Sequence, residues 1–268
     1  MKQYREIPYN YTSFSDKEIV CRFLGCEAWE LLESLRTNRN TGRSARMLFE
    51  VLGDMWVVDR NPYLQEDLIK NQRRWKSLIE ALNSRLDLIR NRADSNNKVL
   101  DLLQSADQAV TKFERCLGDF KQHKKCIKKA LLKVTNNNNI RFDALSRSSH
   151  STDATDWRVE YPQVVITPDT EFEIAAIVKT CIELGLTIIP RGGGTGYTGG
   201  AVPLHTQTAV INTEKVSFIN DVQHTNSIHS VNVGAGVITK RVSELAASKN
   251  LVFAVDPTSQ DACTIGGN

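Results

Sequence analysis

The sequence predicts an α+β fold in which a helical N-terminal unit, residues 1–150, precedes an α/β unit, residues 151–268. The first part holds 27 Lys and Arg against 19 Asp and Glu and the second 7 against 12, which gives net charges of +8 and −5. Glycine is distributed the other way, with 4 of the 15 glycines in the first part. Since charge and glycine content change together, we place the domain boundary near residue 150, beside the polar segments 136–139 and 146–156, where we expect a loop.

The overall composition is that of a globular protein. The chain has 268 residues, of which 41% are hydrophobic and 24% charged, and its mean hydropathy is −0.33. These values exclude collagen-like and wholly disordered chains. The sequence contains no run of 18 apolar residues, and its first residues lack the apolar segment of a signal peptide. The six cysteines are scattered without a C-x-x-C pair, so we expect reduced thiols in a cytoplasmic protein, at most peripheral to the inner face of a membrane.

Apolar residues in the first part recur at helical spacing. One stripe consists of Trp75, Leu78, Ile79, Leu82, Leu86 and Ile89, and a second of Val99, Leu103, Ala106, Val110, Phe113, Leu117 and Phe120. The segment 94–97 interrupts the pattern, so the two stripes predict an antiparallel helical hairpin. Upstream, Asp16 is expected to cap one helix, and Thr41 or Ser44 to begin another.

Two features of this part raise functional alternatives. Residues 121–133 form a basic amphipathic stretch that could meet anionic lipid or nucleic acid, but we favour a solvated helix with its apolar side on the hairpin. No nucleic-acid motif accompanies it, so we expect no nucleic-acid partner. Cys116, His123 and Cys126 could share a helix face, but a structural zinc site needs a fourth ligand, so we expect no metal site.

The second part alternates strands and helices. Residues 163–167 are β-branched and predict a strand, and Thr170 with Glu173 matches a capping box at the start of a helix that Gly185 ends. Residues 186–190 predict a second strand, parallel to the first in a β-α-β unit. Further strands are expected at 209–212, 230–233 and 251–255, and a helix at 239–248.

A glycine-rich loop follows the strand at 186–190. Residues 191–200 contain six glycines, which would be costly to order unless the backbone must approach a ligand closely. Backbone N–H groups in such a loop bind phosphate oxygens as an anion nest. The string from Gly194 to Gly199 also matches G-x-G-x-x-G, with Glu214 twenty residues beyond Gly194, as in nicotinamide-dinucleotide sites. That interpretation fails because Pro203 and polar residues follow where a helix is required.

A second glycine-containing segment ends the chain. The strand at 251–255 leads into residues 256–268, in which a glycine pair follows Thr264. Two such loops, each after a strand, are more specific for a diphosphate ligand than either alone.

These motifs resemble a known family. The segments P-R-G-G-G-T-G-x-x-G-G-A-V-P, V-x-V-G-A-G-V and D-P-T-S-x-x-A-x-T-I-G-G-N resemble the PCMH-type FAD-binding domain of the vanillyl-alcohol oxidase family, in its D-lactate/glycolate dehydrogenase branch. Residues 152–155 resemble the lead-in to the first strand of such domains. The segments at 5–16 and 41–54 are similar to the N-terminal extension of large bacterial FAD-linked oxidoreductases.

The resemblance implies a flavin site. The first loop would wrap the FAD pyrophosphate chiefly through its backbone amides, and the second would complete the flavin and diphosphate contacts. The implied cofactor-binding residues are Pro190, Arg191, Gly192, Gly193, Gly194, Thr195, Gly196, Tyr197, Gly199, Gly200, Pro257, Thr258, Ser259, Thr264, Gly266 and Gly267. Some relatives attach flavin through a histidine where this chain has Thr195, so the resemblance implies non-covalent FAD.

The resemblance also implies what lies outside these residues. The family's domain continues past the I-G-G-N motif into a substrate-binding cap domain, so we interpret the chain as an N-terminal fragment without a catalytic residue that retains FAD weakly or not at all. The whole protein would oxidise a small D-2-hydroxy acid and pass electrons to a carrier. An iron–sulfur cluster would belong to the C-terminal continuation alone. The alternatives are another FAD-dependent alcohol oxidase or reductase of this fold, and a non-catalytic binding module.

Overall fold

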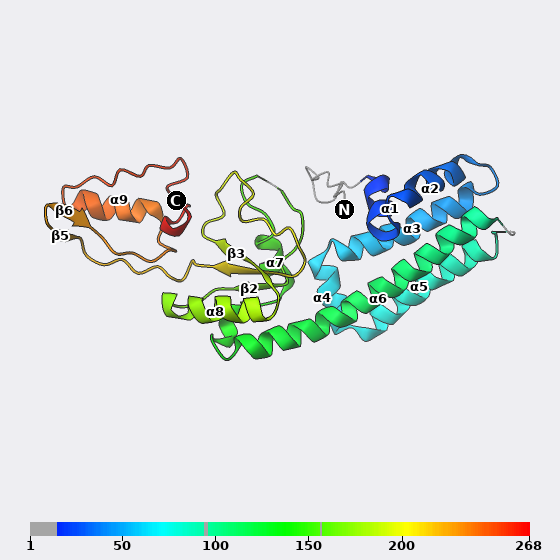
Figure 1. The fold of residues 1–268 in the computed structure, drawn as a ribbon, viewed down its shortest axis with the longest axis horizontal. Coiled ribbons are helices and arrows are strands. Elements are labelled where there is room, and N and C mark those ends of the chain that lie inside the picture. Colours follow the sequence, from blue (N-terminus) through cyan, green and yellow to red (C-terminus); the bar gives the residue numbers. More distant parts are fainter. Residues whose placement is uncertain (1–14, 94–95, 156) are drawn as a thin grey trace. The chain divides into compact units, whose positions relative to one another are not determined.

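A computed structural model describes residues 15–93, 96–155 and 157–268. Residues 5–14 of the motif at 5–16, and Asp94 and Ser95 of the predicted break, lie outside the described residues. The described chain divides into two compact units, one ending at His123 and the other running from Lys124 to Asn268. The boundary near residue 150 rests on composition and stays a prediction. The predicted α+β class is confirmed, with helices first and a partial sheet after them (Figure 1).

The first compact unit consists of helices packed around one apolar core. They are α1 (Asp16–Leu24), α2 (Glu27–Thr37), α3 (Gly42–Asp59), α4 (Pro62–Lys70), α5 (Gln72–Arg90) and most of α6 (Asn97–Leu131). The predicted hairpin of α5 and α6 is confirmed, since Leu82, Leu86, Ala106 and Val110 share this core. The rings of Trp75 and Phe113 lie 5.8 Å apart.

The helix starts follow local capping chemistry. Ser15, rather than Asp16, caps α1, because its side chain accepts a hydrogen bond from the Glu18 N–H. Asp16 is instead the first residue of the helix, where its negative charge suits the helix dipole. Thr41 precedes α3 as predicted, but its hydroxyl donates to the Leu35 carbonyl oxygen at 2.7 Å.

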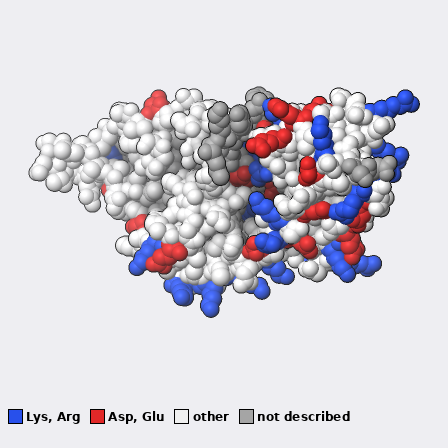
Figure 2. Space-filling view, turned by 45° about the vertical axis from the view of Figure 1, so that its right-hand side comes forward, with Lys and Arg blue, Asp and Glu red and all other residues white. Residues whose placement is uncertain are grey.

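The surface of the protein carries charges of both signs. In the view of Figure 2, Lys and Arg side chains are interspersed with Asp and Glu. In the first compact unit, Arg90 pairs with Asp107 at 2.7 Å and Arg22 with Asp59 at 2.8 Å. None of the helices in the described part combines the length and apolar character that a membrane span requires.

The basic stretch at 121–133 differs from its prediction. Ile127 and Leu131, on its apolar side, are buried with Phe142, Val164 and Ile177 in the core of the second compact unit. The expectation that this side packs on the helical hairpin was therefore wrong. Helix α6 runs past the hairpin without a break, so its last turns meet a different apolar surface.

The second compact unit is built on a four-stranded sheet in the order β1-β2-β4-β3. The strands are β1 (Ile140–Arg141), β2 (Val164–Ile166), β3 (Thr187–Arg191) and β4 (Thr208–Asn212). Strands β2 and β3 both pair with β4 in parallel, which confirms the predicted β-α-β unit and places β4 between its strands. All residues of β2 and β4 are buried, as expected of central parallel strands.

Two short helices flank the sheet. Helix α7 (Ala144–Ser149) is capped by the Asp143 side chain and occupies part of the predicted loop at 146–156. Helix α8 (Glu171–Glu183) ends before Gly185, whose φ of 68° confirms the predicted stop. The capping box does not form, since the Thr170 side chain accepts no backbone N–H and its hydroxyl lies 3.4 Å from Glu173 Oε1. The other oxygen of that carboxylate, Oε2, accepts a hydrogen bond from the Thr135 hydroxyl.

The C-terminal segment departs most from its predicted elements. A hairpin of β5 (Gln223–Thr225) and β6 (Ile228–Ser230) replaces the strand expected at 230–233, from which Val233 keeps an isolated bridge to Ile219. Helix α9 (Thr239–Ser248) has the predicted bounds. Residues 251–255 form no strand, and Val252 is 91% exposed, because no described strand pairs with them.

Candidate functional site

The candidate site lies at the carboxyl edge of the sheet. Because β2, β3 and β4 are parallel, their carboxyl ends meet at one edge. Strand β3 ends at Arg191 and leads into residues 191–200, which we call the first loop. Open α/β sheets bind ligands at this edge, where loops leave the strands.

The first loop needs glycine for two reasons. Gly194 and Gly199 have φ of 68° and 72°, in the left-handed region that disfavours other residues. Gly192 and Gly193 instead lie against another segment of the chain. A Cβ at Gly192 would overlap the Thr264 hydroxyl, and one at Gly193 would overlap the Ala262 carbonyl oxygen. The loop backbone is therefore fixed by its neighbours.

The partner segment, residues 257–267, is the second loop. Its turns are closed by hydrogen bonds from Gln260 N to Pro257 O (2.9 Å) and from Cys263 N to Ser259 O (2.8 Å), and it ends in η2 (Ile265–Gly267). The structure thus brings together two segments about 70 residues apart in the chain. Contact between them is made by Gly192 and Gly193 with residues 262–264, while the Tyr197 side chain points into solvent at 80% exposure.

The remaining predicted site residues extend from this contact. Pro190 lies in β3, in register with Ile211. Thr195, Gly196 and Gly200 continue the first loop, and Thr258 lies in the turn that begins the second. Gly266 approaches Ala235, whose Cβ would lie 2.7 Å from a Cβ at Gly266, and Gly267 donates to the Thr264 carbonyl oxygen at 2.9 Å.

The Arg191 side chain holds the first loop through contacts with its neighbours. Its Nη1 donates to the Thr152 carbonyl oxygen at 2.6 Å, which ties the loop to the segment before β2. Burial lowers the pKa of the guanidinium, and the Asp153 carboxylate opposes that shift. Gly194 lies against the guanidinium, where a side chain would displace it. Arg191 therefore fixes the conformation of the loop.

Trp157 is a site neighbour that sequence patterns did not single out. A Cβ at Gly199 would lie 2.9 Å from its indole Cε3, and the ring is 41% exposed. The lead-in motif at 152–155 ends two residues earlier and is the only sequence signal that could have found it.

The thiol of Cys263 lies within the second loop. Burial acts to raise its pKa, but hydrogen bonds from the side chains of Thr239, Ser259 and Asn268 outweigh burial and lower the pKa. The Thr239 hydroxyl lies 3.2 Å from its Sγ.

The loops fit a diphosphate-containing ligand such as FAD. The Thr264 hydroxyl is buried and has no hydrogen-bond partner among the described residues. A buried hydroxyl without a partner is costly, and a ligand at the loop contact would satisfy it. The glycines expose backbone N–H groups that suit phosphate oxygens. Among the residues that the structure describes, no group of three His, Cys, Asp or Glu could hold a metal ion.

Two family models match the chain. Residues 2–115 match a family described as protein of unknown function (DUF3683). Residues 162–268 match a family described as FAD binding domain. The second match covers both loops and confirms, for these residues, the resemblance found in the sequence motifs.

Curated relatives match part of the chain. The chain is 33% identical over 108 residues to the glycolate oxidase subunit GlcD of Escherichia coli K12, covering 40% of this chain and 21% of the relative. It is 32% identical over 144 residues to the GlcD subunit of Bacillus subtilis, covering 54% and 30%. It is 36% identical over 104 residues to a D-lactate dehydrogenase of Archaeoglobus fulgidus, covering 39% and 22%. The chain thus spans less than a third of the length of these relatives.

Two solved structures overlap part of the chain. An alkyldihydroxyacetonephosphate synthase matches with 19% identity and a TM-score of 0.46, covering 53% of this chain and 30% of that one. A p-cresol methylhydroxylase matches with 16% identity and a TM-score of 0.46, covering 55% and 29%.

Proposed function

We propose that this chain, whose residues 162–268 match the FAD binding domain family, is the cofactor-binding part of a flavin-dependent oxidoreductase that oxidises a small D-2-hydroxy acid. The names of its relatives, which include a glycolate oxidase subunit and a D-lactate dehydrogenase, support this substrate class. Electrons would leave to a carrier, and the substrate would be held by a cap domain.

The observation that carries the proposal is the contact of the two loops at the carboxyl edge of the sheet. Gly192 and Gly193 pack on residues 262–264 with no room for side chains, beside the Thr264 hydroxyl, which has no partner in the described part of the chain. A flexible surface loop would not require such close packing. The arrangement is that of a cradle shaped by backbone atoms.

The chain's own residues would bind and orient the cofactor. The first loop would donate backbone N–H groups to the pyrophosphate, and the Thr264 hydroxyl would add a hydrogen bond. Arg191 would keep the loop in place through Thr152. When bound, FAD supplies the ring system that accepts a hydride from the carbon bearing the hydroxyl group. We assign no catalytic residue to this chain.

Attachment of FAD would be non-covalent. By the family resemblance, Thr195 stands where some members carry the histidine that bonds to flavin, and residues 191–200 contain no histidine. Acid precipitation of a reconstituted complex should therefore release all flavin into the supernatant. Flavin that stays with the precipitated protein would contradict this part of the proposal.

The cofactor assignment is tested by equilibrium titration of the chain with FAD and with NADH, followed by ligand fluorescence. We expect saturable binding of one FAD per chain, with a weak dissociation constant, and no comparable binding of NADH. Binding of NADH alone would overturn the proposal. Salt-sensitive adsorption to anionic vesicles without FAD binding would favour the alternative of a non-catalytic binding module.

The substrate class is tested on the natural gene product loaded with FAD. Under anaerobic conditions, D-lactate or glycolate should bleach the flavin absorbance, whereas L-lactate should not. Bleaching by a non-acidic alcohol in place of these acids would instead favour another FAD-dependent oxidase of the same fold.

A further inference from the structure

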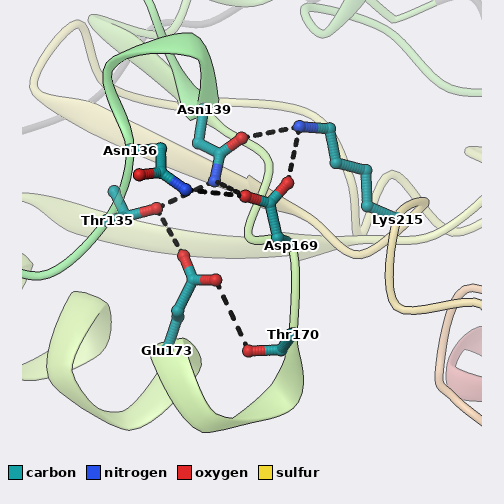
Figure 3. A network of polar contacts seen from close by, with 7 residues as sticks. All are labelled: Thr135, Asn136, Asn139, Asp169, Thr170, Glu173 and Lys215. Carbon is teal, nitrogen blue, oxygen red and sulfur yellow. Dashed lines mark hydrogen bonds and ion pairs between the residues drawn. The ribbon is translucent and has the colours of Figure 1, made fainter.

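Lys215 lies at one end of a polar network at the carboxyl edge of the sheet, and Asn139 and Asp169 lie at the centre of that network (Figure 3). Lys215 follows β4, and its Nζ lies 2.9 Å from Asp169 Oδ1 and donates to Asn139 Oδ1 at 2.6 Å. Asn139 is fully buried, although Lys215 itself is partly exposed. The ammonium group is therefore held at a fixed point beside the end of β2.

The acidic partner of Lys215 is itself tightly held. Asn136 Nδ2 and Asn139 Nδ2 each donate to Asp169 Oδ2 at 3.0 Å. The hydrogen bond from Lys215, followed by those from the two asparagines, lowers the pKa of Asp169 to about 2. This carboxylate thus keeps its charge at all physiological pH values.

The network continues toward helix α8. Asn139 Nδ2 also donates to the Thr135 hydroxyl at 3.0 Å, and that hydroxyl donates to Glu173 Oε2 at 2.5 Å. The backbone N–H of Thr167 donates to the Asn139 carbonyl oxygen at 2.9 Å. The anchor of Lys215 is therefore fixed to both β2 and α8.

The backbone around Lys215 contacts the first loop on one side. Thr213 N donates to the carbonyl oxygen of Arg191, the first residue of that loop, at 3.0 Å. The position of residues 213–216 thus bears directly on the point at which the first loop leaves the sheet.

The same backbone contacts the turn at 234–237 on its other side. Gly236 N donates to Val216 O at 2.8 Å, and a Cβ at Gly236 would overlap the Thr213 carbonyl oxygen. The turn at 234–237 also contacts the second loop, because Gly266 N donates to Ala235 O at 2.9 Å. Residues 213–216 therefore lie between the two loops.

We propose that Lys215 is a positioning residue for the cofactor cradle, which sets the backbone of residues 213–216 between the two loops by anchoring it to Asp169 and Asn139. The inference rests on the proposed flavin-binding function of these loops. Lys215 acts through its backbone neighbours, because Asp169 and Asn139 hold its ammonium group in place.

The test uses Lys215→Met, which keeps the apolar stem and removes the ammonium group. The matched control is Lys249→Met, which removes an exposed ion pair with Asp221 (3.0 Å) in the same compact unit. Hydrogen exchange of the whole chain is measured in the absence of ligand. In Lys215→Met we expect exchange about 10-fold faster at residues 234–237 and 265–267, with the helices of the first compact unit unchanged. Lys249→Met should leave both loops unchanged.

Titration with FAD adds a second readout. Lys215→Met should raise the dissociation constant about 10-fold, and Lys215→Arg should restore much of the affinity because its guanidinium can reach the same carboxylate. Unchanged exchange in both segments, or a uniform increase over the whole unit, would overturn the inference. Absence of FAD binding by the unmodified natural gene product would count against the proposed function, while the exchange data would still decide the positioning role.

Discussion

Gly193 lies against the carbonyl oxygen of Ala262, in a gap that leaves no room for a Cβ atom. This contact joins a loop that follows β3 to one that closes the chain. The candidate cofactor cradle therefore keeps its shape only while residue 193 has no side chain.

Replacing Gly193 by Ala should disrupt this contact. The added methyl group meets a backbone atom, which cannot move as a flexible side chain would, so we expect a loss of about 1–3 kcal/mol in the free energy of unfolding. FAD binding should weaken in parallel. Gly196→Ala is the matched control, because nothing lies within 4 Å of a Cβ at that position. Thermal unfolding of both variants decides the matter, and equal stability of the two would contradict the packing argument.

Replacing Thr264 by Val should separate stability from binding. The Thr264 hydroxyl is buried without a partner among the described residues, so an isosteric methyl group should leave the free energy of unfolding unchanged or raise it. Affinity for FAD should nevertheless fall by about 10-fold, as expected from loss of a hydrogen bond to a charged group. Thr180→Val, in α8, provides a comparison away from the loops. A variant of Thr264 that binds FAD normally would show that its hydroxyl does not contact the ligand.

Protonation of His150 should destabilise the folded protein. Burial lowers the pKa of this imidazole, and the positive charge of Arg191 lowers it further. Its Nδ1 lies 2.8 Å from the Ser146 carbonyl oxygen and its Nε2 lies 2.9 Å from Asn212 Nδ2, a pattern that the neutral Nδ1–H tautomer satisfies. A proton on Nε2 would face the Asn212 amide donor.

The direction of the pH effect follows from this lowered pKa. Below about pH 6.5 the unfolded chain binds a proton at His150 that the folded chain resists, so stability falls as the pH falls. His150→Gln cannot titrate and should lose less stability between pH 7.5 and about pH 5. Denaturant unfolding at several pH values measures both proteins. Parallel pH profiles would refute the assignment of this dependence to His150.

Truncating Leu86 should destabilise the first compact unit. Leu86 is a fully buried residue of α5. Replacing it by Ala should lower the free energy of unfolding by about 2–5 kcal/mol. Leu88→Ala, at a position that is 47% exposed in the same helix, should have little effect. Hydrogen exchange should show the loss in α5 and α6 first. An equally large effect of both substitutions would contradict the core assignment.

Local patterns in the sequence were sufficient for elements whose stability is local. The spacing of Leu82, Leu86 and Ile89 predicted α5, and the run at 239–248 predicted α9 with its observed bounds. Parallel orientation of β2 and β3 followed from the helix between them. The glycines of the first loop signalled a backbone that approaches something closely.

Predictions failed where a distant partner decides the outcome. The apolar run at 251–255 matched a strand, but a strand exists only when another strand pairs with it, and no described strand does so. The capping box at Thr170 does not form, and the Glu173 carboxylate also accepts a hydrogen bond from Thr135, 38 residues away in the sequence. The apolar side of 121–133 packs on the sheet because α6 continues past the hairpin.

The sequence by itself determined the class of the fold, the order of strands and helices in the β-α-β unit and the two glycine-containing segments, because periodicity and glycine content are local properties. Only the tertiary structure decided that Gly193 meets Ala262, that the Thr264 hydroxyl finds no partner among the described residues and that Lys215 reaches Asp169 across 46 residues of sequence. Such contacts form because parallel strands bring their carboxyl ends to one edge of the sheet. No local sequence pattern predicts which residues come together there.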